Sequence, residues 1–268
     1  MHDSINLSVF IPNEELPIII PFGPRWCGKT LMIYRLCEYL HTQGYHVNPV
    51  REFIQKWNQH YLRDCECYLE SLYKHDPSQL YICDPILLQI IDSRGNQICY
   101  IFDADGDCYF NPHYPDAPYP TFINQILHSP NPKRFIYFVE PCWSDIMGRK
   151  EYVDRIAKLQ KHSYSPKKDA CFILYNKIDQ TPFDVQKRDH IIAAIKDCRM
   201  NYEGLWHIFR QNNPFKRWLQ PYKAKFIPFT SFAPVPEEIY TPSLDLYPER
   251  LWKVITNSIK NRKYRVHQ

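Results

Sequence analysis

The chain has 268 residues, of which 44% are hydrophobic and 23% are charged, and this composition is ordinary for a folded α/β protein. Its 33 Lys and Arg residues barely outnumber its 29 Asp and Glu residues, which does not favour a nucleic-acid-binding protein. No apolar run reaches the roughly 18 residues of a membrane-spanning helix, and residues 1–4 lack the basic start of a secretory signal. The ten cysteines lie mostly in apolar or helical runs, so we expect reduced thiols and a cytoplasmic protein.

An apolar run over residues 16–21 is predicted to form the first strand, and it leads directly into a phosphate-binding pattern. The pattern G-x-x-x-x-G-K-[ST] is filled by Gly23, Pro24, Arg25, Trp26, Cys27, Gly28, Lys29 and Thr30. Such a loop, placed between a strand and a helix N-terminus, directs backbone N–H groups at phosphate oxygens. Lys29 is expected to reach the β- and γ-phosphates, and the Thr30 hydroxyl is expected to bind Mg²⁺.

The next elements are less distinctive. A helix is predicted over residues 29–42 with Gly44 at its C-cap, followed by a short strand over 45–50. Residues 51–75 are predicted to be helical and to form an insertion. The Cys65-x-Cys67 spacing in this insertion matches no strong zinc site.

A β-hairpin is predicted next, because apolar runs over residues 86–91 and 97–102 flank a segment with turn composition. The second run ends in Asp103-Ala104-Asp105-Gly106. This is a D-x-x-G pattern, although an Asp-Gly turn after a strand is also common in proteins without a nucleotide site.

The segment after this pattern contains Asp107 and His113, which by themselves read as ordinary exposed loop residues. Residues 110–120 are too rich in proline for a helix. Their tyrosines and prolines suit either a protein-contact surface or a stiff loop packed on its own domain.

The second half of the chain alternates predicted strands and helices, which favours a mainly parallel sheet covered on both faces. Strands are expected over 134–140, 170–175 and 224–229, and helices over 149–162, 186–199 and 245–262. Asn176-Lys177-Ile178-Asp179 follows the second of these strands, and Thr230-Ser231-Phe232-Ala233 follows the third. The basic tail over residues 260–265 is either a solvated helix end or a weak contact for an anionic partner or membrane surface.

These four patterns occur in the order found in the Ras-like and translation-factor P-loop GTPases, and the chain resembles that family over residues 16–260. The loop spelling Gly-Pro-Arg-x-x-Gly-Lys-Thr also resembles the bacterial double-GTPase families. The resemblance implies a three-layer α/β P-loop fold with a mainly parallel sheet, one antiparallel edge hairpin and helices on both faces. It further implies a single G domain over residues 1–268, with insertions near 51–80 and 200–220.

The resemblance also implies that GTP or GDP and Mg²⁺ are the ligands of this site. Asp103 would hold Mg²⁺, generally through a water molecule. The Gly106 N–H would contact the γ-phosphate and so respond to its presence.

The guanine base would be recognised by the other two patterns. The Asp179 carboxylate would accept hydrogen bonds from guanine N1–H and the N2 amino group, a pair of donors that adenine lacks. Asn176 would hold the loops together, and the Lys177 stem would lie along the base plane. The segment Ser231-Phe232-Ala233 would contact guanine O6 through a backbone N–H.

Two departures from the family pattern predict slow hydrolysis. No threonine occurs between Gln43 and Pro120 to ligate Mg²⁺, and Ser78 is the best-placed substitute unless it merely caps a turn. Asp107 stands where the family has a water-orienting glutamine, and the resemblance makes Asp107 and His113 the candidate catalytic residues that could orient water. Arg25 could act as an arginine finger in cis or make a surface salt bridge.

We therefore expect acceleration of hydrolysis by a protein partner or by dimerisation through the switch regions. One alternative is a guanine-nucleotide-binding scaffold without hydrolysis. The other is a P-loop ATPase or kinase, although the Asn-Lys-x-Asp pattern argues against it.

Overall fold

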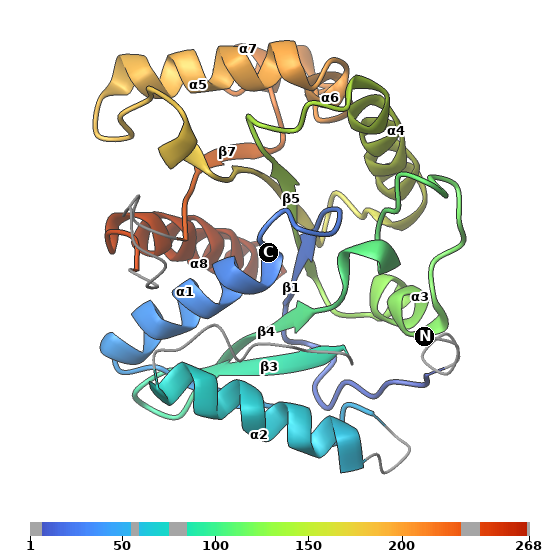
Figure 1. Cartoon of the computed structure of the whole chain (residues 1–268), viewed down its shortest axis with the longest axis vertical. Coiled ribbons are helices and arrows are strands. Elements are labelled where there is room, and N and C mark those ends of the chain that lie inside the picture. The colour runs from blue at the N-terminus through green and yellow to red at the C-terminus, as the bar shows by residue number, and fades with distance from the viewer. Residues whose placement is uncertain (1–6, 55–58, 75–84, 232–241, 267–268) are drawn as a thin grey trace.

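The computed structural model describes residues 7–54, 59–74, 85–231 and 242–266. Its centre is a seven-stranded sheet in the order β2-β3-β4-β1-β5-β6-β7 (Figure 1). The strands are β1 (Ile18–Phe22), β2 (His46–Pro49), β3 (Ile86–Ile91), β4 (Gln97–Asp103), β5 (Lys133–Val139), β6 (Ala170–Tyr175) and β7 (Lys225–Pro228).

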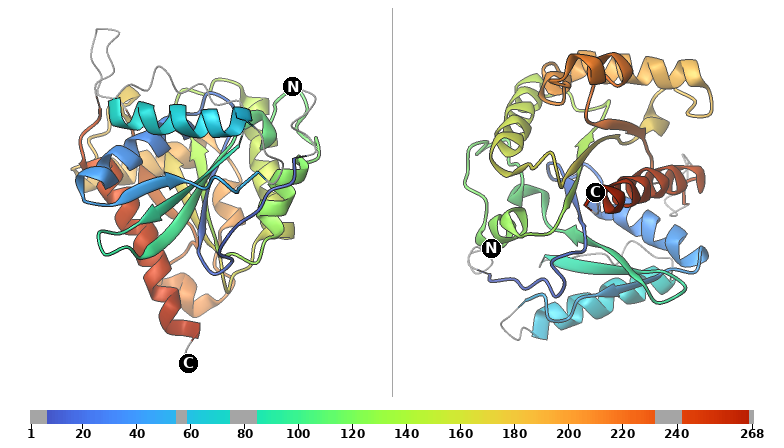
Figure 2. Two further views of the ribbon diagram at one scale, coloured as in Figure 1. Left: turned by 90° about the horizontal axis from the view of Figure 1, so that it is seen from below. Right: turned by 180° about the vertical axis from the view of Figure 1, so that it is seen from behind.

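Helices cover both faces of this sheet. They are α1 (Lys29–Thr42), α2 (Gln59–Lys74), α3 (Thr121–His128), α4 (Ile146–Ser163), α5 (Arg188–Asn201), α6 (Leu205–Ile208), α7 (Pro214–Leu219) and α8 (Leu246–Val266). Helices α1 and α8 pack against each other on one face, while α3 and α4 lie on the other (Figures 1 and 2). None of the helices in the described ranges has both the length and the apolar character needed to cross a membrane.

The strand directions confirm the predicted fold class. Strand β1 is parallel to both β4 and β5, and β6 and β7 continue the parallel arrangement. Strand β3 is antiparallel to β4, as the predicted hairpin requires. The hairpin itself does not form the edge of the sheet, because β2 pairs antiparallel with β3 and lies outside it.

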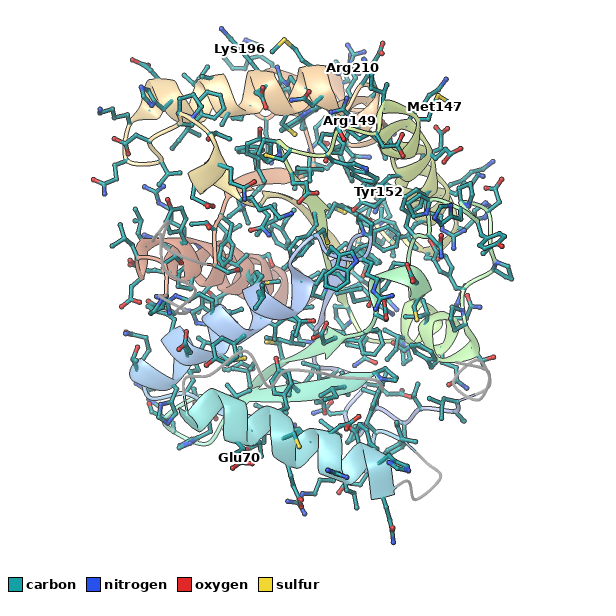
Figure 3. The ribbon with its side chains drawn as sticks, in the orientation of Figure 1. Glu70, Met147, Arg149, Tyr152, Lys196 and Arg210 are labelled. Atoms are coloured by element: carbon teal, nitrogen blue, oxygen red, sulfur yellow. The ribbon has the colours of Figure 1, made fainter. Side chains whose placement is uncertain are left out.

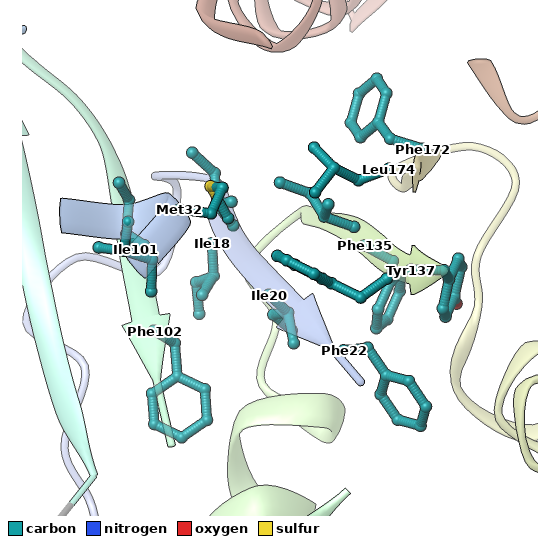
Figure 4. Packing of buried hydrophobic residues seen from close by; sticks show 14 of the residues in the cluster. Ile18, Ile20, Phe22, Met32, Ile101, Phe102, Phe135, Tyr137, Phe172 and Leu174 are labelled. Atoms are coloured by element: carbon teal, nitrogen blue, oxygen red, sulfur yellow. The ribbon is translucent and has the colours of Figure 1, made fainter. Parts of the chain in front are cut away.

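The central strands are buried on both faces, which explains their nearly continuous apolar sequences. Every residue of β1 and β5 is buried. Their side chains pack with those of α1, β4 and β6 into one core cluster, and Figure 4 shows its centre. The labelled residues there are Ile18, Ile20, Phe22, Met32, Ile101, Phe102, Phe135, Tyr137, Phe172 and Leu174.

Most predicted elements form within a few residues of their expected bounds. Helix α1 has its predicted bounds, and Gly44 follows it at φ 77°, the left-handed conformation of a helix C-cap. The predicted insertions contain α2 in one case and α6 with α7 in the other. Helix α3 was not expected, and it begins immediately after Pro120. A single domain over residues 1–268 stays a prediction.

Candidate functional site

The phosphate-binding pattern forms a loop that joins the end of β1 to the start of α1. Gly28 precedes α1 with φ 87°, a conformation that L side chains rarely adopt. A Cβ on Gly23 would lie 2.6 Å from the Cys27 sulfur and 2.9 Å from the Phe138 Cβ. Both glycines of the pattern are therefore required by the backbone path and by its close packing.

Lys29 lies inside the curve of this loop. Its Nζ donates to the carbonyl oxygens of Gly23 at 3.1 Å and Pro24 at 2.9 Å, and only 6% of the residue is exposed. The ammonium group is thus held close to the N-terminus of α1. Both features attract an anion, because the helix dipole and the lysine add positive potential at the same place.

Trp26 and Arg25 form the outer bend of the loop. Trp26 has φ 66° and is 81% exposed, and the Arg25 guanidinium lies 5.1 Å from the centre of its ring. The Arg25 guanidinium also pairs with the Asp107 carboxylate at 3.8 Å. Both charged groups are partly exposed, so this contact matches the surface salt bridge that was one alternative for Arg25.

Asp103 is buried beside the loop at the end of β4. Burial raises its pKa to about 6, although the charge of Lys29 and the nearby Thr30 hydroxyl and Ala104 N–H lower it. Neither carboxylate oxygen has a hydrogen bond of ordinary geometry to a described residue. A buried carboxylate with free lone pairs beside a threonine hydroxyl fits Mg²⁺, which prefers hard oxygen ligands.

Gly106 brings the D-x-x-G segment against the phosphate loop. A Cβ on Gly106 would lie 2.5 Å from the Arg25 Cα and closer still to the Arg25 nitrogen and the Pro24 carbonyl carbon. The Asp105 side chain accepts from the Asp107 N–H at 3.0 Å and thereby starts the 3-10 turn η3 (Gly106–Cys108). The close approach explains why a glycine stands at this position.

The proline-rich segment after Asp107 is held to α4. Arg155 donates to the carbonyls of Tyr109 at 3.2 Å and Ala117 at 2.7 Å, and its guanidinium lies 3.9 Å from the Tyr119 ring centre. These contacts describe a loop packed on the protein itself. His113 is exposed in this segment, and its backbone N–H donates to the Asn111 side chain at 2.9 Å.

The Asn-Lys-x-Asp turn contacts the phosphate loop directly. The Asn176 amide donates to the Cys27 carbonyl at 2.8 Å, and a Cβ on Gly28 would lie 2.5 Å from that amide nitrogen. Within the described residues, Asp179 Oδ1 is buried without a hydrogen-bond partner. Lys177 adopts φ 57° and forms an ion pair with Glu140, which directly follows β5.

Ser231 reaches the same region from the end of β7. It is buried, and its carbonyl accepts from the Ser243 N–H at 3.2 Å. The chain just before Ser231 is bonded to the Asn-Lys-x-Asp turn, because the Ile178 N–H donates to the Phe229 carbonyl at 3.2 Å. Phe232 and Ala233 lie outside the described residues, as does Ser78.

Sequence reasoning missed several residues that support the site. Arg35 on α1 donates to the Ser243 carbonyl at 2.7 Å and pairs with Asp245, so it holds residues 243–245, which precede α8. Tyr152 of α4 donates to the Phe22 carbonyl, immediately before the phosphate loop, at 2.8 Å. Figure 3 shows Tyr152 and its neighbour Arg149 on α4. Their partners are too far away in sequence for a local pattern to identify them.

No group of three His, Cys, Asp or Glu side chains suited to a metal ion occurs in the described part of the chain. The combination of Thr30 and Asp103 differs from such a site, because phosphate oxygens would supply further ligands.

No family model and no curated protein matches this sequence. A solved nucleolar GTP-binding protein 1 from Plasmodium falciparum is similar at 14% identity and a TM-score of 0.47, covering 97% of this chain and 93% of that one. The GTP-bound GTPase-like domain of S. cerevisiae Ski7 is similar at 14% identity and a TM-score of 0.44, covering 91% of this chain. The aligned region spans 50% of that Ski7 chain.

The fold itself rests on the strand order and on the phosphate loop. A mainly parallel sheet, a hairpin leading into D-x-x-G and a phosphate loop between β1 and α1 together make this a three-layer α/β P-loop fold.

Proposed function

We propose that this chain is a Mg²⁺-dependent GTP-binding protein that hydrolyses GTP slowly and acts as a nucleotide-controlled switch. The observation that carries this proposal is the 2.8 Å hydrogen bond from Asn176 to the Cys27 carbonyl. It joins a turn with a guanine-reading pattern to a phosphate-binding loop. One nucleotide could therefore contact both at once, with its phosphates on the loop and its base on the turn.

The phosphate half of the site has the charge that a nucleoside triphosphate needs. The N-terminus of α1 and the Lys29 ammonium would bind the β- and γ-phosphates. Mg²⁺ would be held by the Thr30 hydroxyl and the Asp103 carboxylate, and when bound it would neutralise phosphate charge. Gly106 lies against Pro24 and Arg25, where its N–H would respond to a γ-phosphate.

The base half of the site favours guanine. Asp179 offers a buried oxygen that has no hydrogen-bond partner among the described residues, and such an acceptor is costly unless a ligand satisfies it. Guanine presents two adjacent donors to a carboxylate, whereas adenine presents an acceptor at N1. The turn of Ser231 closes the same region, and its backbone would contact guanine O6.

Hydrolysis would be slow because the water-orienting position is filled by Asp107. Its carboxylate is repelled by the γ-phosphate unless a cation compensates, and its present partner is Arg25 at 3.8 Å. His113 is a second candidate for orienting water, although its position in an exposed loop would require that loop to move. A partner or a second copy bound at the switch regions would accelerate the reaction, and a cytoplasmic location suits this role.

A guanine-nucleotide-binding scaffold without hydrolysis is the second candidate. The Arg25–Asp107 pair favours it, because that pair occupies the position where the family orients its water. Hydrolysis measured with and without Mg²⁺ separates this scaffold from the switch. An ATPase or kinase would require ATP to compete equally with GTP.

The proposal is tested by replacing Lys29 with Ala. We expect GDP affinity to fall by at least about 100-fold, since the variant loses a buried charged hydrogen-bond donor to phosphate. Calorimetric titration of GDP into nucleotide-free protein measures this change. Retained nanomolar affinity in a folded Lys29→Ala variant would rule out the phosphate loop as the binding site.

A further inference from the structure

Lys177 has an acidic partner that the motif itself does not explain. Its ammonium group forms an ion pair with the Glu140 carboxylate, and both side chains are mostly shielded from solvent. The lysine backbone adopts φ 57°, which is uncommon for a residue other than glycine. The turn after β6 and the ion pair to the end of β5 together fix where this side chain can lie.

Glu140 is in turn held by a single buried tyrosine. The Tyr202 hydroxyl donates to the Glu140 carbonyl at 3.0 Å and accepts from the Glu140 N–H at 3.0 Å. Tyr202 is 1% exposed and directly follows α5, and burial raises its pKa so that the hydroxyl stays protonated. One hydroxyl thus satisfies both backbone groups of Glu140.

These charges lie next to the phosphate loop. Burial raises the pKa of the Cys27 thiol, and the charge of Lys29 lowers it. Glu140 also raises this pKa and Lys177 lowers it, so both members of the ion pair act on this loop residue. Asn176, which directly precedes Lys177, also bonds the Cys27 carbonyl. The ion pair therefore belongs to the boundary between the phosphate half and the base half of the site.

A carboxylate at this boundary opposes an anionic ligand through its charge. Attraction for nucleotide therefore cannot account for Glu140, and its contacts with Lys177 give it another role. A free lysine side chain has about 2 kcal/mol of rotamer entropy to lose when it is ordered. A lysine already held in place loses less of that freedom on binding, which raises affinity for the base.

We propose that Glu140 is a positioning residue for guanine-nucleotide binding: it holds the Lys177 stem in place for the base, and Tyr202 holds Glu140. This inference rests on the proposed guanine-nucleotide site and deepens it. It makes the strength of base binding depend on the segment around Tyr202, which lies outside the four sequence patterns.

The test compares ligands with and without a base. In Glu140→Gln we expect GDP affinity to fall about tenfold, through faster dissociation, while affinity for inorganic tripolyphosphate changes less than about twofold. In a Lys177→Ala background the same substitution should change GDP affinity less than about twofold, as a double-mutant cycle requires. Tyr202→Phe should weaken GDP binding in the same direction without weakening tripolyphosphate binding.

The matched control is Glu66→Gln, which removes the same charge from an exposed position on α2 and should change neither affinity. Unchanged or tighter GDP binding by Glu140→Gln would overturn this inference but not the proposed function. The same would follow if Glu140→Gln weakened GDP binding equally in the wild-type and Lys177→Ala backgrounds. Equal binding of GDP and ADP by the wild-type protein would overturn the proposed function and this inference with it.

Discussion

Replacing Gly106 with Ala should separate the recognition of GTP from that of GDP. The added Cβ would lie 2.5 Å from the Arg25 Cα, whereas non-bonded carbons normally approach to about 3.5 Å. One of the two loops must therefore move by about 1 Å. The phosphate loop is fixed by hydrogen bonds from Lys29 and Asn176, so we expect the D-x-x-G loop to move instead.

The magnitude follows from the cost of overpacking, about 1–3 kcal/mol at a closely packed position. That cost falls on the closed arrangement in which the Gly106 N–H would meet the γ-phosphate. We expect affinity for a non-hydrolysable GTP analogue to fall about tenfold or more, and affinity for GDP to change less than about threefold. Titrations with fluorescently labelled forms of the two nucleotides, monitored by their fluorescence, give the two affinities.

The control is Gly95→Ala in the β3–β4 turn. A Cβ at Gly95 meets nothing within 4 Å, but the residue has φ 83°, so the substitution should cost about 1 kcal/mol of stability without changing nucleotide binding. An unchanged ratio of the GTP-analogue and GDP affinities in a folded Gly106→Ala variant would refute the reasoning about loop contact.

Two further predictions concern stability. Burial raises the folded-state pKa of Asp103 from 3.8 to about 6, so the ligand-free protein should lose about 3 kcal/mol of stability as pH rises between those values. Between pH 4 and pH 7, the free energy of unfolding of Asp103→Asn should therefore fall by about 3 kcal/mol less than that of the wild type. Denaturant unfolding of both proteins at the two pH values measures this difference. An equal pH dependence in the two proteins would contradict the burial of Asp103. Arg35→Met removes a buried guanidinium that bonds the Ser243 carbonyl and pairs with the buried Glu38 carboxylate, and it should destabilise the protein by about 3 kcal/mol. Thermal unfolding measures this loss, with Glu66→Gln as the surface control, and equal melting temperatures would contradict the structural role of Arg35.

Local sequence was sufficient for the elements whose signals lie within a few residues. The apolar run before Gly23, the left-handed Gly28 and the strand before Asn176 each specify their own conformation, because burial and backbone sterics act over short distances. The prediction of the hairpin leading into Asp103 was confirmed for the same reason.

Long-range partners could not be predicted in this way. Arg35 is 208 residues from Ser243, and Tyr202 is 62 residues from Glu140, so only the folded sheet brings them together. Helix α3 was missed because the proline-rich segment before it gave no periodic signal, while its first turn depends on packing against the core. The pairing of β2 with β3 also depends on sheet register rather than on its own short sequence.

The most direct test of guanine recognition is the base preference of Asp179→Asn. The account predicts that the wild-type protein binds GDP at least about tenfold more tightly than xanthosine diphosphate, because the carboxylate accepts two hydrogen bonds from guanine. The variant should reverse this preference, since an amide can donate to the xanthine O2 and accept from its N1–H. Competition titrations of both diphosphates against both proteins measure the ratio. A guanine preference that is unchanged in Asp179→Asn would contradict the assignment of this turn to the base.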